Sequence, residues 1–253
     1  MAHESQELFG DDRFPPTRRS VVAAAQSIDA EERERAMEAL CEAYWRPVYK
    51  YIRLRWSRPS EDAQDLTQGF FVTLIERELL AQYFPSKSRL RTYLRVCVDS
   101  FVLNEHKSAK RQKRGGTFQH LALDFAGAEE ELGANTVDIS SIPSPESLEQ
   151  LFEKEWIRSL FALSVEDLRK YCEQKDRRRT FSLFEAYDLS ENKEISYEML
   201  ATEYGISVTD VTNALSWARK EFREIALSRL REISGSDEEF QREAQAVFGW
   251  QAK

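Results

Sequence analysis

The chain has 253 residues, with 36 Lys and Arg against 44 Asp and Glu, which gives a formal net charge of −8. Hydrophobic residues make up 42% and charged residues 32%, a composition that excludes wholesale disorder and indicates a soluble globular protein of one or two domains. The 9 Gly and 7 Pro are roughly half of average usage, so long helices are favoured over a turn-rich β fold, while the negative charge by itself argues against nucleic-acid binding.

The sequence contains no motif of a known catalytic or phosphate-binding site. No apolar run is long enough to cross a membrane, and the first residues lack the features of a signal peptide, so a cytoplasmic protein without membrane insertion is predicted. Cys41, Cys97 and Cys172 are widely separated and are predicted to be small core residues. The three His are also scattered. We therefore predict no catalytic residue, no metal and no cofactor.

Two helices are predicted first along the chain, because apolar residues recur there at a spacing of three and four. The first covers residues 30–56, and Pro47 is expected to kink or interrupt it. The second has Ser60 as its expected N-cap and runs to about residue 80. Acidic residues in its opening turns lie beside the positive end of the helix dipole, where they stabilise the helix.

Charge becomes uneven in the segments that follow. After a loop over about 81–88, a helix is predicted over about 89–110, and residues 86–115 hold nine Lys and Arg against two acidic residues, a local charge of +7. Residues 116–153 contain eight acidic residues and no Lys or Arg. Gly, Pro and the lack of sustained periodicity predict a flexible acidic linker over 116–145. The expected fold is therefore all-α, with two helical domains on either side of this linker.

The most informative short segment is residues 196–223, which follows two further predicted helices. Ser196 is expected to cap a short helix, and Gly205 to form a turn with positive φ. Ser207 and Asp210 then form the S-x-x-D pattern of a capping box at the start of a second helix. This order of features is typical of a helix-turn-helix, although it also fits a purely structural helical hairpin.

Two stretches of the sequence resemble regions of bacterial extracytoplasmic-function (ECF) sigma factors, a subfamily of the sigma-70 type. EDAQDLTQGFFVTLIER at 61–77 resembles the acidic segment of region 2, whose usual pattern is close to DAEDLVQETFLRLWR, and the basic helix at 88–115 resembles the part that follows. ISYEMLATEYGISVTDVTNALSWARKEFR at 195–223 resembles region 4. The opening strings are similar to a longer, planctomycete-like branch, and the resemblance covers about residues 14–250.

The resemblance implies a function and a domain scheme. Such proteins are not enzymes; they bind core RNA polymerase and direct promoter-specific initiation. Region 2 at 26–115, after an N-terminal extension at 1–25, would melt and read the minus-ten element. Region 4 at 146–253 would read the minus-35 element through the helix-turn-helix and would end in a C-terminal helical extension. Core polymerase and promoter DNA are the implied partners, with an anti-sigma factor or a Ser/Thr kinase as further candidates.

The resemblance also assigns DNA-binding residues. In region 2, Tyr83 or Phe84 would stack on a flipped base, and the basic run would contact phosphates. The residues assigned to the minus-ten element are Tyr83, Phe84, Lys87, Arg89, Arg91, Arg95, Asn104, Lys107, Lys110 and Arg111. Those assigned to the minus-35 element are Ser207, Thr209, Thr212, Asn213, Ser216, Arg219 and Lys220, which are of types that hydrogen-bond base edges or phosphates.

The acidic segment carries the implied contact with polymerase. Asp62 and Asp65 match the family's contact to the clamp helices, and Gln68 is placed with them. Two other positions of the segment lack an acidic residue that the family often has. A phosphate on Thr67 would restore negative charge there, so this residue is a candidate phosphorylation site.

Each feature also has a plainer interpretation. Carboxylates stabilise the start of any helix, basic runs are commonly solvated helix ends, and Tyr83 and Phe84 would equally serve to anchor their loop in the core. Two other classes of protein therefore stay open. One is a helix-turn-helix regulator that binds DNA as a dimer without polymerase, and the other is an adaptor that keeps the fold but has lost DNA binding.

Overall fold

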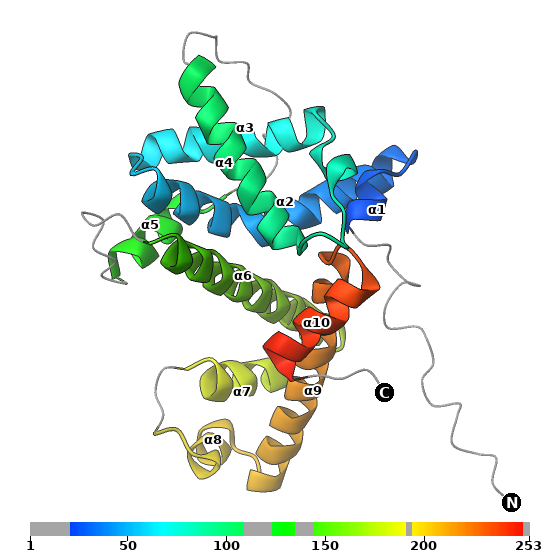
Figure 1. Ribbon diagram of the computed structural model, residues 1–253. Helices are drawn as coiled ribbons and strands as arrows, with labels where there is room; N and C mark the ends of the chain where they lie inside the picture. The colour runs from blue at the N-terminus through cyan, green and yellow to red at the C-terminus, as the bar shows by residue number, and fades with distance from the viewer. Residues whose placement is uncertain (1–20, 109–122, 135–143, 191–193, 250–253) are drawn as a thin grey trace, which may run out of the picture.

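The computed structural model describes residues 21–108, 123–134, 144–190 and 194–249, and all regular structure in these ranges is helical (Figure 1). The predicted all-α class is confirmed for these residues. The helices in chain order are α1 (Val21–Ala25), α2 (Ala30–Arg55), α3 (Ser60–Glu76), the 3₁₀ helix η1 (Leu79–Gln82), α4 (Leu90–Ser108), α5 (Phe125–Ala134), α6 (Pro145–Gln174), α7 (Arg178–Asp188), α8 (Tyr197–Tyr204), α9 (Val208–Glu232) and α10 (Asp237–Phe248). None of them combines the length and the apolar character that a membrane-spanning segment needs.

Helix α2 is the centre of the N-terminal part of the molecule. The Asp29 side chain accepts a hydrogen bond from the amide of Glu31 and caps the helix, as an N-cap aspartate is expected to do. The helix continues through Pro47, so the expected interruption there is wrong. Pro47 is itself buried, and the packing of α1, α3 and α6 around α2 stabilises the helix against the cost of the missing amide, about 3 kcal/mol.

Helix α3 begins one residue away from the predicted position. Its N-cap is Pro59, which makes no side-chain capping bond, and Ser60 is the first helical residue rather than the cap. The Ser60 hydroxyl instead bonds to the Tyr49 hydroxyl at 2.9 Å and accepts a hydrogen bond from Gln64 at 3.0 Å. The side chain that was expected to cap α3 therefore ties it to α2.

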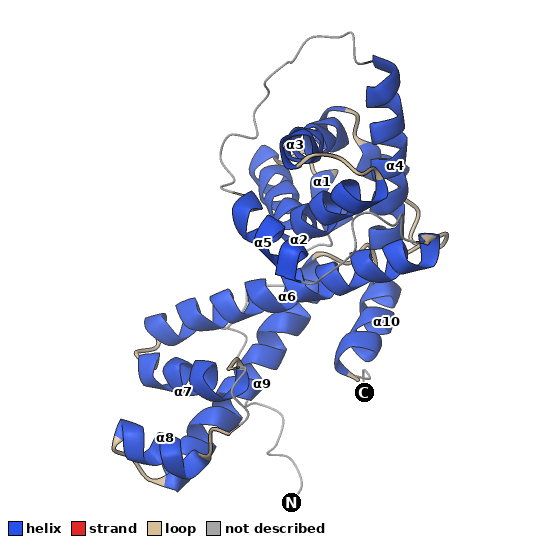
Figure 2. Cartoon of the chain, turned by 90° about the vertical axis from the view of Figure 1, so that its left-hand side faces the viewer, coloured by secondary structure: helices blue, strands red, loops and turns tan. Residues whose placement is uncertain are grey.

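Two hydrophobic cores share two long helices. The first core combines α1 to α5 with the N-terminal part of α6, the end of α9, and α10. The second combines the rest of α6 and α9 with α7 and α8. Figure 2 shows α6 and α9 running from the upper helices into the lower ones. Leu160 belongs to the first core and Leu168 to the second, so the cores meet within α6 and not in the segment before it.

The segment predicted as a flexible linker contains an ordered helix. Within 116–145, residues 125–134 form α5, which packs on α2 with Ala128 and Leu132 buried, whereas 116–122 and 135–143 lie outside the described residues. The Phe125 ring meets the Trp45 ring edge to face, with 5.3 Å between centroids. The acidic residues of α5 pair with cations of α2, as Arg53 does with Glu129, which explains how so acidic a segment can dock.

The expected burial of cysteine holds for two of the three residues. Cys41 and Cys172 are buried, and Cys97 is half-buried on α4. Burial raises the pKa of each thiol, because the thiolate is poorly solvated inside the protein. These are packing residues with little thiolate at neutral pH.

Candidate nucleic-acid interface

Helices α8 and α9 form the predicted helix-turn-helix. Ser196 caps α8 by accepting a hydrogen bond from the amide of Met199, and Gly205 takes φ 62° at the turn. Ser207 and Asp210 form both bonds of the capping box at the start of α9. Hydrogen bonds from Ser207 lower the pKa of the Asp210 carboxyl, so it stays ionised beside the positive end of α9. These local predictions are confirmed.

One face of α9 is polar and exposed. Val211, Leu215 and Ala218 are buried against the second core and fix the orientation of the helix, whereas Val208 at its first position is exposed. All seven residues assigned to the minus-35 element are exposed: Ser207, Thr209, Thr212, Asn213, Ser216, Arg219 and Lys220. The helix therefore presents hydrogen-bonding side chains of the types that read base edges.

The cations at the far end of this face are held by neighbouring side chains. Arg219 Nη2 lies 2.9 Å from Asp188 Oδ1, and its guanidinium also donates to the Tyr197 hydroxyl. The hydrogen bond to Asp188 raises the pKa of Arg219. Lys220 Nζ lies 3.8 Å from the Glu224 carboxylate. Arg219 thus braces α9 against α7 and α8, while the first turns of α9 carry the hydroxyl and amide groups.

We expect Ser207→Ala to lower the stability of the helix-turn-helix by about 1 kcal/mol, because the amide of Asp210 loses its capping partner. Thermal unfolding followed by circular dichroism measures the loss. Ser216→Ala removes an exposed hydroxyl from the middle of the same helix and should be neutral or slightly stabilising. Equal effects of the two substitutions would show that the capping box contributes nothing.

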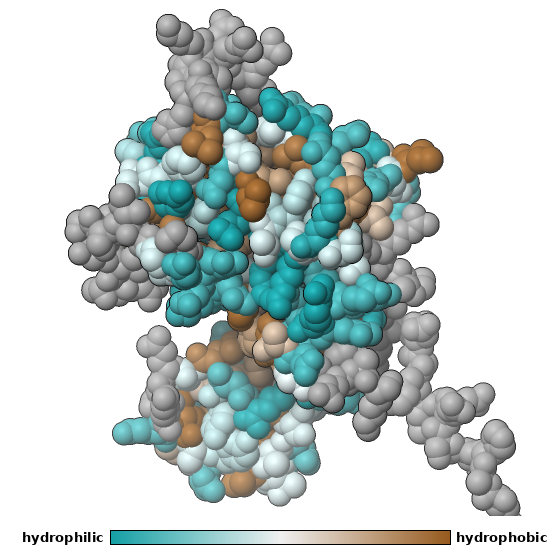
Figure 3. All heavy atoms as spheres, viewed as in Figure 1, coloured by the Kyte–Doolittle hydropathy of each residue, from teal (hydrophilic) through white to brown (hydrophobic). Residues whose placement is uncertain are grey.

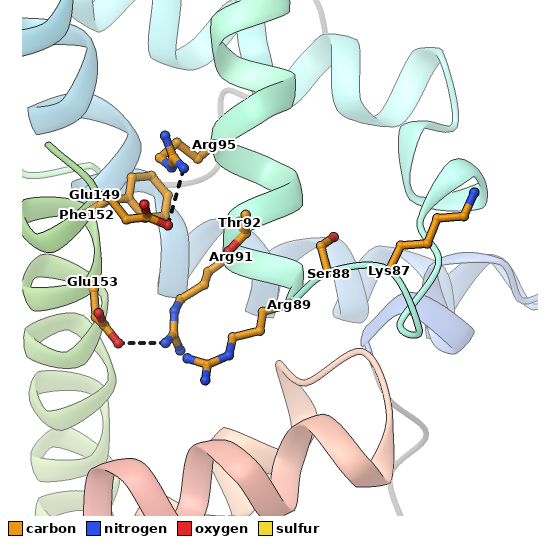
Figure 4. A pocket seen from close by; sticks show the side chains of 9 residues that line it. All are labelled: Lys87, Ser88, Arg89, Arg91, Thr92, Arg95, Glu149, Phe152 and Glu153. Atoms are coloured by element: carbon orange, nitrogen blue, oxygen red, sulfur yellow. Dashed lines mark hydrogen bonds and ion pairs between the residues drawn. The ribbon is translucent and has the colours of Figure 1, made fainter. Parts of the chain in front are cut away.

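Four of the residues assigned to the minus-ten element, all of them cations, line a cavity of about 350 Å³ between α4 and α6 (Figure 4). Its lining residues are Lys87, Ser88, Arg89, Arg91, Thr92, Arg95, Glu149, Phe152 and Glu153. Figure 4 shows Lys87 pointing away from α6, while the three arginines lie toward α6 and α10. The cavity therefore has cations from α4 on one wall and carboxylates from α6 on the other.

The arginines of α4 are paired with carboxylates. The buried guanidinium of Arg91 bonds to Glu243 and, at 2.6 Å, to Glu153, and it lies 4.9 Å from the centre of the Trp156 ring. Arg95 lies 3.4 Å from Glu149. Figure 3 shows hydrophilic side chains gathered over the band where α6 and α10 lie below α4. In this arrangement carboxylates occupy the positions that phosphates were expected to take.

The two aromatic residues of the preceding loop differ in exposure. Tyr83 is buried, and its hydroxyl donates to Glu239 and to the carbonyl of Ser88, both at 2.9 Å. Burial and then Glu239 raise the pKa of Tyr83, so the hydroxyl stays protonated. Phe84 is 54% exposed, with Lys87 Nζ 4.6 Å from its ring centre. Of these two aromatic rings, only that of Phe84 is accessible in this arrangement.

The last four residues assigned to the minus-ten element are Asn104, Lys107, Lys110 and Arg111. Asn104 is exposed on α4. The Lys107 side chain, Lys110 and Arg111 lie outside the described residues.

The predicted polymerase-contacting residues share an exposed face of α3. Asp62, Asp65 and Gln68 are all exposed and follow one another at a spacing of three residues. On another side of α3, a Cβ atom at Gly69 would lie 3.2 Å from the Phe101 ring, so α3 packs closely on α4 there.

Thr67 is on the opposite side of α3. Its side chain is fully buried, and its hydroxyl donates to the carbonyl of Ala63 at 2.7 Å. In this arrangement a kinase would have to open α3 to reach the hydroxyl, so phosphorylation of Thr67 stays a prediction that requires this opening.

The acidic partners of the α4 arginines were missed from the sequence. Glu239 and Glu243 are separated by four residues, as are the buried Phe240 and Ala244, so both pairs lie on the inner side of α10. Two carboxylates on the apolar side of an amphipathic helix are the signal that indicates buried cationic partners. The sequence does not reveal that the partners of α10 lie far away along the chain. Leu90, whose amide bonds to Glu239, is 149 residues from it.

No family model, curated protein or solved structure matches this chain. In the described ranges, no three His, Cys, Asp or Glu side chains are grouped in the way that would hold a metal ion.

Proposed function

We propose that this protein is a sigma factor of the extracytoplasmic-function type, which binds core RNA polymerase and directs it to specific promoters. The observation that carries the proposal is the α8–α9 helix-turn-helix, with a capped second helix and an exposed polar face. The exposed acidic face of α3 is on the same chain and supplies a separate surface for a protein partner. Cytoplasmic location belongs to the same proposal, because the polymerase is there.

In this proposal α9 enters the major groove at the minus-35 element. The N-terminal part of a recognition helix contacts base edges, and this part of α9 carries Thr209, Thr212 and Asn213. An asparagine amide can pair with both the N6 and N7 positions of adenine, and a threonine methyl group can contact the thymine methyl group. The polar face therefore has the chemistry to read a sequence containing A·T pairs.

The N-terminal helices take the minus-ten element in the same proposal. Phe84 is the exposed aromatic for a flipped base, and stacking of this kind contributes about 1–3 kcal/mol per base. The arginines of α4 would contact phosphates after the carboxylates of α6 and α10 had moved away. Asp62 and Asp65 would contact the polymerase clamp.

The pairing of the α4 arginines favours a second candidate function. With Arg91 and Arg95 neutralised by carboxylates, α9 is the exposed nucleic-acid face of this arrangement. A polymerase-independent helix-turn-helix regulator needs only that face, and it would bind two half-sites as a dimer, about 34–36 Å apart.

Gel filtration of the full chain with core RNA polymerase separates these functions. Co-elution of one chain per polymerase is the result expected of a sigma factor. Binding of a palindromic duplex by a dimer, without co-elution, would favour the regulator instead. If neither complex forms, the chain is an adaptor of the kind that has lost DNA binding.

Replacing Asn213 with Ala should reduce transcription from a promoter that depends on its minus-35 element by roughly tenfold, because a lost bidentate base contact costs about 1–3 kcal/mol. The melting temperature should not fall, since the side chain is exposed. Gln241→Ala removes a matched, exposed amide from α10 and serves as the control. A promoter-independent loss, or no loss, would contradict the assignment of Asn213 to base contact.

A further inference from the structure

The inner face of α10 lies against the beginning of α4. Ser236 caps α10 by accepting a hydrogen bond from the amide of Glu239, and Glu239 and Glu243 then lie on one face, both almost fully buried. Figures 1 and 2 both place α10 beside the region where α4 begins and α6 passes below it. Two adjacent carboxylates are thus directed at one end of a helix.

Glu239 accepts a hydrogen bond from a backbone amide at the N-terminus of α4. Its Oε1 accepts a hydrogen bond at 2.6 Å from the amide of Leu90, the first residue of α4, and its Oε2 accepts one at 2.9 Å from the Tyr83 hydroxyl. The first amides of a helix have no partner within the helix and carry the positive end of its dipole. At Gly235 a Cβ atom would lie 2.3 Å from the Tyr83 ring, so glycine permits this close approach.

Glu243 neutralises the two arginines beside this helix end. Its carboxylate bonds to Arg91 and lies 3.3 Å from Nε of Arg89. Figure 4 shows both guanidinium groups directed toward α10, with Glu153 of α6 on the other side of Arg91. The oxygen that faces Arg89, Glu243 Oε1, is buried and makes this ion pair, but it accepts no hydrogen bond within the described part of the chain, so the contact is imperfectly satisfied.

The groups that hold these carboxylates are also typical phosphate ligands. Helix N-terminal amides bind phosphate because of their orphan N–H groups and the dipole, and arginine binds phosphate through paired N–H donors. Arg89, Arg91 and the Leu90 amide therefore form one cationic site, which we call the α4 anion site. Carboxylates from α10 fill it in this structure.

We propose that α10 is an autoinhibitory latch: Glu239 and Glu243 mask the α4 anion site, and release of α10 opens this site to DNA phosphates. The biological purpose of the latch rests on the proposed function, because a masked site would keep the free protein from DNA until a partner displaces α10. Its physical test needs neither polymerase nor a promoter.

The test uses the full chain and two measurements. Glu243→Gln and Glu239→Gln each remove one masking charge, while Glu238→Gln removes the same charge from the exposed side of α10. Hydrogen–deuterium exchange of residues 237–248 reports release of α10. Fluorescence anisotropy with a short, labelled DNA duplex of arbitrary sequence reports phosphate binding at two salt concentrations. Two latch variants are used so that one still gives a result if circular dichroism shows the other to be unfolded.

We expect faster exchange of α10 and tighter DNA binding for Glu243→Gln and Glu239→Gln than for Glu238→Gln. Two newly available phosphate contacts should steepen the plot of log DNA affinity against log salt concentration by about 1.8. Lowering the salt concentration from about 200 to about 50 mM should therefore raise the DNA affinity of the latch variants roughly tenfold more than that of Glu238→Gln. Release of α10 without this gain in DNA affinity would overturn the claim that α10 masks the α4 anion site. Unchanged hydrogen–deuterium exchange of α10 would overturn the claim that Glu239 and Glu243 hold α10 in place. If the latch holds but the chain never co-elutes with polymerase, only the proposed function fails.

Discussion

Replacing Lys50 with Met is expected to lower the free energy of unfolding by about 3–5 kcal/mol, because it leaves a buried carboxylate without its main partner. Lys50 lies on α2 and is only 1% exposed. Its Nζ lies 2.6 Å from Glu155 of α6 and 2.6 Å from Glu131 of α5. Glu155 is also buried, and among the described residues it would keep its ion pair with Arg158, whereas Glu131 is partly exposed and would be solvated.

Chemical denaturation followed by circular dichroism measures this cost. Lys154→Met removes the same charge from an exposed position beside Glu155 and should change the free energy of unfolding by less than about 0.5 kcal/mol. Adding Glu155→Gln to Lys50→Met should restore part of the loss, because no buried charge is then left unpaired. A cost below about 1 kcal/mol for Lys50→Met would show that this pair does not hold α6 on α2.

Replacing Asp65 with Lys should weaken binding to core RNA polymerase by roughly tenfold to a hundredfold, a change of about 1.4–2.8 kcal/mol. The proposed contact requires negative charge on the exposed face of α3, and placing the wrong charge opposite a partner is strongly unfavourable. Asp65 is exposed, so the fold should be retained. Asp62→Lys is expected to act in the same direction.

Glu76→Lys is the matched control, because it reverses an exposed charge at the other end of the same helix. Binding titrations of the three variants with core polymerase compare them directly. Equal losses for Asp65→Lys and Glu76→Lys would indicate a general charge effect. Unchanged affinity for Asp65→Lys would remove α3 from the polymerase interface.

The local features of the fold could be predicted from the sequence. The period of apolar residues predicts α2 and α3 to within a few residues at each end, because such faces must be buried. The turn at Gly205 and the capping box at Ser207 depend on neighbouring residues alone, so they were also predictable. Pro47 shows the limit of local rules, because packing around α2 outweighs its effect as a helix breaker.

The long-range features could not be predicted in the same way. A count of charge along residues 86–115 indicates a basic surface, but it does not show that Arg91 and Arg95 are paired with α6 and α10. The acidic residues after position 116 were interpreted as a linker, although Glu129 and Glu131 hold α5 on α2. In both cases each charge is ordinary in its own segment, and only the tertiary fold brings the partners together.

Run-off transcription with purified core RNA polymerase is the direct test of sigma-factor function. Adding the full chain should produce transcripts from a defined start site on DNA carrying its cognate promoter, whereas core polymerase alone should not. Asn213→Ala should reduce these transcripts when the minus-35 element is required. A chain that binds DNA but never supports a promoter-dependent transcript, across a library of promoter sequences, would contradict the proposal that it is a sigma factor.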